Sequence, residues 1–270
     1  MFLRTMTFAA KYGPWALVTG AGRAEGLGFE FASQLAAKGI NLILVDVLAE
    51  ETEARAKEIR SVHGVEAIPV CMDLGRRAFR DELLAAVGER EVGLLVCNHM
   101  YSPKDTPTVL DMEPEQLDAM IDINARAYTH LVHAFGNPMV ARGRGGIILV
   151  SSGAGIIATP YATLYAANKG YQRLLGEGLW YELKGTGVDV AVVVAGMMNT
   201  QVDALSGYPS FIIMETEPVV REVLDALGKR VRVLPGPVNK SLIFVQSRLM
   251  SVKAVVNQLG GFMAKGLGKE

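Results

Sequence analysis

The sequence predicts a doubly wound parallel α/β fold in three layers, with helices on both faces of one central sheet. Short apolar runs, typical of buried strands, alternate with stretches of helix length. A glycine-rich turn separates the first strand from the first helix, and polar residues follow the ends of several strands. Because ligands bind at the carboxyl ends of the strands in such sheets, we expect one composite site there.

Strands and helices are expected to alternate from residue 15 onward. The strands are expected at residues 15–19, 41–46, 66–70, 92–97, 146–150 and 188–195. The helices are expected at residues 29–38, 49–61, 79–90, 114–140 and 161–184. Gly39 closes the first helix, and Pro114 suits the first turn of the fourth, where its missing N–H group has no helical partner to lose.

Size and composition favour one large α/β domain. The chain has 270 residues, of which 50% are hydrophobic, which is enough to bury a sizeable core. We expect an N-terminal extension over residues 1–14, the α/β domain over 15–234 and a helical appendage over 235–270. A net charge of −1 gives no attraction to nucleic acid.

The expected location is the cytoplasm. Residues 1–14 lack a signal-peptide pattern, and no apolar run approaches the roughly 18 residues of a membrane span. Cys71 and Cys97 lie in or beside apolar runs, which suits a reduced intracellular protein.

The turn after the first strand has the layout of a dinucleotide site. It contains Gly20, Gly22, Gly26 and Gly28. Glycines let the backbone approach a pyrophosphate, and the following helix offers N–H groups and its positive dipole end. Asp46 ends the second strand, where a carboxylate can hold the adenosine ribose and would repel a 2′-phosphate. NAD is therefore expected in preference to NADP, although Arg23 in the turn offsets part of this repulsion.

A hydroxyl, a phenol and an ammonium group can meet at the carboxyl edge of the sheet. Tyr165 and Lys169 are four residues apart, so they share one face of a helix. Ser152 follows the fifth strand. A neighbouring positive charge lowers the pKa of a phenol from its usual value of about 10. We therefore expect Lys169 to lower the pKa of Tyr165, so that the phenol can exchange a proton with an alcohol or a carbonyl oxygen.

Over residues 15–234 the sequence resembles the short-chain dehydrogenase/reductase family. The resemblance is carried by Thr19-Gly20, Gly26, Gly28, Asp46, Asp73-Leu74, Asn98, Asn124, Ser152, Tyr165 with Lys169, and Gly196 with Thr200. It implies a Rossmann fold with a substrate loop at 197–218, a nicotinamide cofactor, and a homodimer or homotetramer.

The resemblance also implies catalytic roles for four residues. Tyr165 would be the general acid/base, and Lys169 would lower its pKa and hold the nicotinamide ribose. Ser152 would hydrogen bond to the reacting oxygen. Asn124 would support a water-linked proton relay to the lysine.

On the cofactor side, the resemblance implies that Asp73 contacts the adenine, Asn98 lines the groove and Thr200 meets the carboxamide region. Further expected cofactor contacts are Gly20, Gly22, Arg23, Gly26, Leu27, Gly28, Leu74, Tyr165, Lys169 and Gly196.

The sequence departs from the family pattern in three places. The spacing from Gly20 to Gly26 is two residues longer than usual, which leaves open whether Gly22, Arg23 or Ala24 touches phosphate. His99 and Met100 replace small residues after Asn98, and Ala195 replaces the usual proline before Gly196. His99 either lines the substrate pocket or has a structural role.

The favoured function is an NAD(H)-dependent oxidoreductase that interconverts a secondary alcohol and a ketone. Apolar residues dominate 197–218 and suit a lipophilic substrate, either steroid-like or an acyl ketone. The alternatives are an NADP-dependent 3-oxoacyl-thioester reductase and a non-catalytic nucleotide-binding protein. An esterase is disfavoured because Ser152 lacks the Gly-x-Ser-x-Gly elbow. No metal site is expected, because His130 and His133 lack further ligands.

The last part of the chain is basic. Between Asp225 and Glu270 there are eight lysines and arginines and no acidic residue, with apolar residues interleaved. We favour packing on the chain's own domain or on a second subunit. The alternative is contact with an anionic membrane or an acyl thioester.

Overall fold

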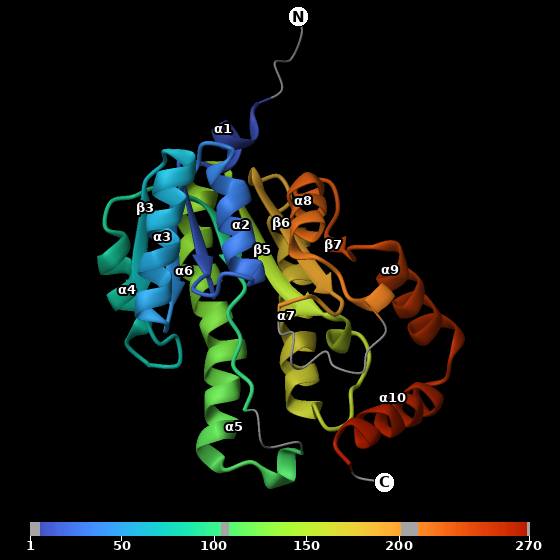
Figure 1. Ribbon diagram of the computed structural model, residues 1–270. Coiled ribbons are helices and arrows are strands. Elements are labelled where there is room, and N and C mark those ends of the chain that lie inside the picture. Colours follow the sequence, from blue (N-terminus) through green and yellow to red (C-terminus); the bar gives the residue numbers. More distant parts are fainter. Residues whose placement is uncertain (1–5, 104–107, 201–209, 269–270) are drawn as a thin grey trace, which may run out of the picture.

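A parallel sheet forms the centre of the protein (Figure 1). The computed structural model describes residues 6–103, 108–200 and 210–268. In this part of the chain the sheet has seven strands in the order β3-β2-β1-β4-β5-β6-β7. They are β1 (Trp15–Thr19), β2 (Asn41–Asp46), β3 (Ala67–Cys71), β4 (Val92–Cys97), β5 (Gly145–Ser152), β6 (Val188–Ala195) and β7 (Arg232–Val233). The order turns back between β1 and β4, so the predicted doubly wound fold is confirmed.

Helices cover both faces of the sheet (Figure 1). One face is covered by α2 (Leu27–Ala36), α3 (Ala49–His63) and α8 (Thr216–Ala226). The other is covered by α4 (Phe79–Val87), α6 (Ala127–Ala141) and α7 (Thr163–Glu182). The shorter elements are α1 (Phe8–Tyr12), α5 (Pro114–Ile121), the 3-10 turns η1 (Val109–Asp111), η3 (Gly153–Gly155) and η5 (Ser210–Ile212), and the π-turn η2 (Asp122–Arg126). Because both faces of the sheet are covered, the central strands are apolar along their whole length.

The helix expected over 114–140 is divided by a π-turn. Helix α5 leads into η2 and then into α6, and Asn124 lies at the middle residue of the turn. The apolar pattern predicted helix throughout because a single π-turn changes the spacing of side chains only locally.

The first residues pack into the same core as the rest of the domain. Tyr12 is buried at the end of α1, and its hydroxyl donates a hydrogen bond to Asp189 Oδ2 at 2.6 Å. Lys11 forms an ion pair with the same carboxylate.

A C-terminal arm follows β7, formed by α9 (Pro237–Phe244), the π-turn η6 (Val245–Leu249) and α10 (Val252–Gly266). Its buried residues Ile243 and Val255 pack with Ile157, in the segment after β5. Asn239 Nδ2 donates to Val194 O at 3.1 Å. The arm thus lies beside the carboxyl ends of β5 and β6. Among the helices described, none is long and apolar enough to cross a membrane.

Candidate active site

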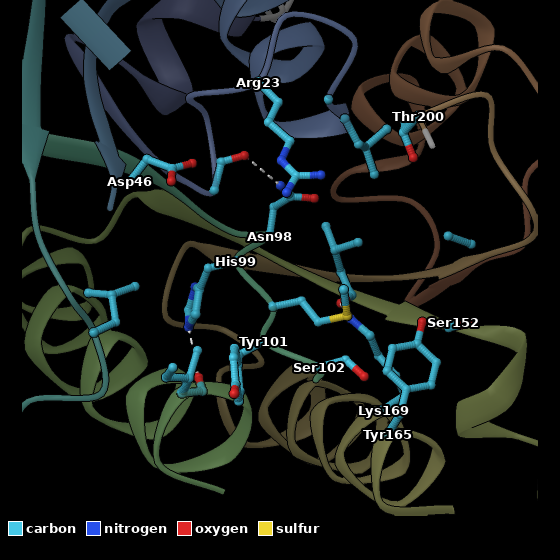
Figure 2. Close-up of a pocket in the computed structure, with 18 of the residues that line it drawn as sticks. Arg23, Asp46, Asn98, His99, Tyr101, Ser102, Ser152, Tyr165, Lys169 and Thr200 are labelled. Carbon is cyan, nitrogen blue, oxygen red and sulfur yellow. Dashed lines mark hydrogen bonds between the residues drawn. The ribbon is translucent and has the colours of Figure 1, made fainter. Parts of the chain in front are cut away.

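A pocket of about 1130 Å³ opens at the carboxyl ends of the strands. Figure 2 shows Arg23, Asp46 and Thr200 toward one end, and Tyr165 and Lys169 at the other. The predicted site residues that line the pocket are Gly20, Arg23, Gly26, Leu27, Asp46, Asp73, Leu74, Asn98, Ser152, Tyr165, Lys169, Gly196 and Thr200. The structure therefore brings together residues that are up to 180 positions apart in the chain.

Close backbone approach shapes the glycine turn between β1 and α2. Gly20 has a φ of +68°, and a Cβ there would lie 2.9 Å from the His99 Cα. Gly28 lies behind the pocket lining, where a Cβ would collide with the Gly20 carbonyl oxygen. Helix α2 begins at Leu27 without a side-chain cap. Its first N–H groups are therefore available to an anion at this end of the pocket.

The Asp46 carboxylate is fixed by the backbone at the end of β2. It accepts hydrogen bonds from Gly22 N at 2.8 Å and from Leu48 N at 3.3 Å. The longer turn places Gly22 against this carboxylate, behind the pocket lining, and brings Arg23 to the pocket wall. Ala24 is exposed and does not belong to that wall.

Ser152, Tyr165 and Lys169 come together where β5 ends against α7. The Ser152 side chain lies close enough to the Tyr165 hydroxyl to lower its pKa. The Lys169 ammonium donates to Val150 O at 3.0 Å and lies 5.7 Å from the centre of the Tyr165 ring. One hydroxyl, one phenol and one amine thus share this end of the pocket, as their spacing predicted.

The expected lowering of the Tyr165 pKa is wrong for this structure. Burial raises the pKa of Tyr165, and the neighbouring Ser152 side chain opposes this rise only in part. Lys169 is itself buried, which lowers its pKa to about 7. A buried amine that loses charge near neutral pH, and that points to a backbone carbonyl, is a weak source of positive potential for the phenol.

Asn124 lies behind the pocket lining and holds one part of it. Its Oδ1 accepts from Tyr101 N at 2.8 Å, and its Nδ2 donates to Tyr101 O at 2.7 Å. Tyr101, Ser102 and Pro103 all line the pocket. The buried amide of Asn124 therefore fixes the backbone of this wall.

His99 belongs to the pocket wall, but its ring is buried and only 7% of the residue is exposed. Nδ1 lies 2.7 Å from Thr19 Oγ1, and Nε2 lies 3.0 Å from Ile123 O. In Figure 2 the ring points toward the helix below it and away from Tyr165. Burial lowers the pKa of His99 to about 3, so the ring is neutral at physiological pH.

Two further polar residues that the sequence did not indicate, Asn168 and Gln172, are also buried on α7. Asn168 Nδ2 donates to Met120 O at 3.2 Å, and Gln172 Nε2 donates to Asn124 O at 2.9 Å. They lie three and seven residues after Tyr165. A polar stripe at helical spacing on the Tyr165 face was the signal that could have identified them.

Residues 201–209 of the expected substrate loop 197–218 lie outside the described residues. From the described parts, Met100 and Met198 line the pocket. His130 packs edge-on against Phe79, with ring centres 6.1 Å apart.

Comparison with known proteins identifies the family. The family model for short chain dehydrogenases matches residues 14–207. A 7beta-hydroxysteroid dehydrogenase of Collinsella aerofaciens is 32% identical over 249 residues, covering 88% of this chain and 92% of the relative. A very-long-chain 3-oxoacyl-CoA reductase of Podospora anserina is 33% identical over 221 residues, covering 81% of this chain and 64% of the relative.

Similar solved structures support the same family. A structure from work on 7beta-hydroxysteroid dehydrogenase stereoselectivity has a TM-score of 0.89 and 29% identity, and the match covers 94% of this chain and all of that one. A metagenomic short-chain oxidoreductase in complex with NADP has a TM-score of 0.66 and 28% identity, and the match covers 83% of this chain and 97% of that one.

The fold and these matches define an oxidoreductase. The chain belongs to the short-chain dehydrogenase/reductase family.

Proposed function

We propose that this protein interconverts a secondary alcohol and a ketone on a lipophilic, steroid-like substrate, with NAD(H) as the hydride carrier. The observation that carries the proposal is that Ser152, Tyr165 and buried Lys169 line one end of a pocket that also contains the glycine turn and Asp46. A protein that only binds nucleotide has no evident need for this set of groups.

The residues at the nucleotide end fit a nicotinamide dinucleotide. The backbone around Gly20, where a Cβ would be too close to His99, and the uncapped start of α2 suit a pyrophosphate. Asp46 would hold the adenosine ribose, Asp73 and Asn98 would line the groove, and Lys169 would hold the nicotinamide ribose. A bound nicotinamide supplies or accepts the hydride.

We propose NAD in preference to NADP because of Asp46. Its carboxylate is held by two backbone N–H groups, so it cannot easily turn away from a 2′-phosphate. Arg23 at the same end is exposed, and its charge acts through solvent. The NADP complex of a 28% identical relative shows that the fold also accommodates NADP, so the cofactor must be tested directly.

Ser152 and Tyr165 would handle the proton. Because burial raises the pKa of Tyr165, the phenol is protonated at neutral pH and can donate its proton to a carbonyl oxygen during reduction. Ser152 would donate a hydrogen bond to the same oxygen. In oxidation the phenol must lose its proton first, which favours higher pH.

The substrate class rests on two supports. Met100 and Met198 give the described part of the pocket flexible apolar lining, and the 7beta-hydroxysteroid dehydrogenases are similar over nearly their whole length. The second candidate is a 3-oxoacyl-thioester reductase. It is supported by similarity to 3-oxoacyl-CoA reductases and by the acid-free, basic C-terminal segment, which could attract an anionic thioester.

A substrate panel tests the proposal. Steroid alcohols and ketones, 3-oxoacyl thioesters and small polyols are offered with each cofactor, and the absorbance of reduced nicotinamide is followed. We expect the highest kcat/KM with a steroid and NAD(H). Faster turnover of polyols than of any apolar ketone, or no turnover at all, contradicts it.

A further inference from the structure

The π-turn η2 lies between α5 and α6 and carries Asn124. Ala127 N donates to Asp122 O, a spacing of five residues in place of the usual four. Such turns are rare, interrupt the regular hydrogen bonding of a helix and occur often at functional sites. What holds this turn in place therefore bears on the position of Asn124.

His99 supports the turn from the side of the sheet. A carbonyl oxygen only accepts hydrogen bonds, so the 3.0 Å contact to Ile123 O requires the proton on His99 Nε2. Nδ1 then accepts from the Thr19 hydroxyl at 2.7 Å. The Tyr128 hydroxyl donates to His99 O at 2.9 Å. The centres of the His99 and Tyr128 rings lie 4.5 Å apart. His99 thus connects the end of β1, the end of β4 and the π-turn.

Gln172 supports the turn from the catalytic helix. It is fully buried, and its Nε2 donates to Asn124 O at 2.9 Å. This donation fixes the orientation of the amide, and no residue that the structure describes donates to Gln172 Oε1. An apolar side chain could not make the hydrogen bond to Asn124 O, so packing alone does not explain a glutamine here.

Asn124 transmits the position of the turn to the pocket. Both ends of its side-chain amide bond to the Tyr101 backbone, at 2.8 and 2.7 Å. In Figure 2 Ser102 lies between Tyr101 and Tyr165. A shift of the π-turn would therefore move the wall that faces the phenol.

We propose that His99 and Gln172 are positioning residues that hold the π-turn, so that Asn124 keeps the Tyr101–Pro103 wall in register with Tyr165. The effect on catalysis rests on the proposed function, whereas the effect on the wall does not. His99 acts from the nucleotide side of the pocket and Gln172 from the catalytic helix, so the turn joins the two.

The test compares His99→Leu, Gln172→Met and the double variant with the matched control His133→Leu, which replaces an exposed histidine on α6. Turnover and cofactor affinity are measured well below the melting temperature of each variant. The melting temperature itself is determined in a separate experiment. Because small misplacements of reacting groups cost large factors in rate, we expect each single variant to lower kcat about tenfold. Substrate KM should rise about threefold. Cofactor Kd should stay within about twofold, because both side chains act on the Tyr101–Pro103 wall.

The double variant should lose less than the product of the two single losses, because both residues act through one turn. A lower melting temperature with unchanged kcat and KM would show that the two side chains only stabilise the fold, and would overturn the proposal.

Hydrogen exchange of the unliganded protein separates this proposal from the proposed function. Faster exchange over residues 100–103 and 120–128 in His99→Leu and Gln172→Met, but not in His133→Leu, is expected even if no substrate is turned over. Absence of turnover in the unmodified protein would contradict the proposed function alone. Unchanged exchange in these segments would contradict the positioning role.

Discussion

Two walls of one pocket are built in different ways. The nucleotide wall, which contains Gly20 and Asp46 with Gly28 behind it, depends on backbone approach and on a carboxylate fixed by backbone N–H groups. The catalytic wall, which contains Tyr165 and Lys169, depends on side-chain groups, and the buried Lys169 ammonium donates to Val150 O. Changes in the first should alter cofactor binding, and changes in the second should alter turnover.

The largest effect is expected in the catalytic wall. Tyr165→Phe keeps the ring and removes the oxygen that is proposed to exchange the proton. Loss of a general acid/base typically costs about 10²–10⁴-fold in rate, so kcat should fall in that range while cofactor Kd stays within about twofold. Steady-state rates and cofactor titration check both values. A large loss of cofactor affinity would erase the distinction between the walls.

A backbone change tests the nucleotide wall. Gly28→Ala places a Cβ against the Gly20 carbonyl oxygen, so we expect a loss of about 1–3 kcal/mol in the free energy of unfolding together with weaker cofactor binding. Gly178→Ala is the matched control, because a Cβ at this position in α7 meets open space and should stabilise the protein by about 0.5–1 kcal/mol. Denaturant titration compares the two. Equal effects would mean that close approach at Gly28 is unimportant.

A charge change in the nucleotide wall should affect the choice of cofactor more than the rate. Asp46→Ala removes the repulsion of a 2′-phosphate, and the ratio of kcat/KM for NAD to that for NADP should fall about tenfold. The same ratio measured for Glu53→Ala, a substitution on the outer surface of α3, should not change. An unaltered ratio in Asp46→Ala would refute the role assigned to that carboxylate.

The remaining effect, on stability alone, is expected where the walls meet, at His99. Its pKa is about 3 when folded and 6.5 in the reference state, so the unfolded chain takes up the proton first. Neutral His99 therefore makes its full contribution to the free energy of unfolding above pH 6.5. This contribution is lost as pH falls toward 3, by up to about 1.4 kcal/mol per pH unit. Lys169 has a lowered pKa of about 7 and titrates above this window.

Urea unfolding at pH 7.5, 6 and 5 measures this contribution. The unmodified protein should lose more stability on acidification than His99→Leu. Parallel pH profiles for the two proteins would show that the histidine is not held neutral in the folded state.

The sequence predicted the features that depend on local spacing. The bounds of β1, β2, β4 and β6 followed from their apolar runs. The residues expected at strand ends all line the pocket, namely Asp46, Asp73, Asn98, Ser152 and Gly196. The strand β7 has only two residues, too few for a pattern to indicate.

Features that depend on burial could not be read from the sequence. The raised pKa of Tyr165 and the lowered pKa of Lys169 both follow from burial. The same holds for His99, whose ring could have entered the pocket but is directed to Ile123 by a buried hydrogen bond.

The most direct test of the central claim follows the hydride itself. The protein is incubated with a steroid ketone and with reduced nicotinamide cofactor that carries deuterium at the transferable position. The mass of the product alcohol is then measured by mass spectrometry. The account predicts one deuterium on the product carbon with the unmodified protein and almost none in the same time with Tyr165→Phe. A product without deuterium, or equal labelling by Tyr165→Phe, would contradict it.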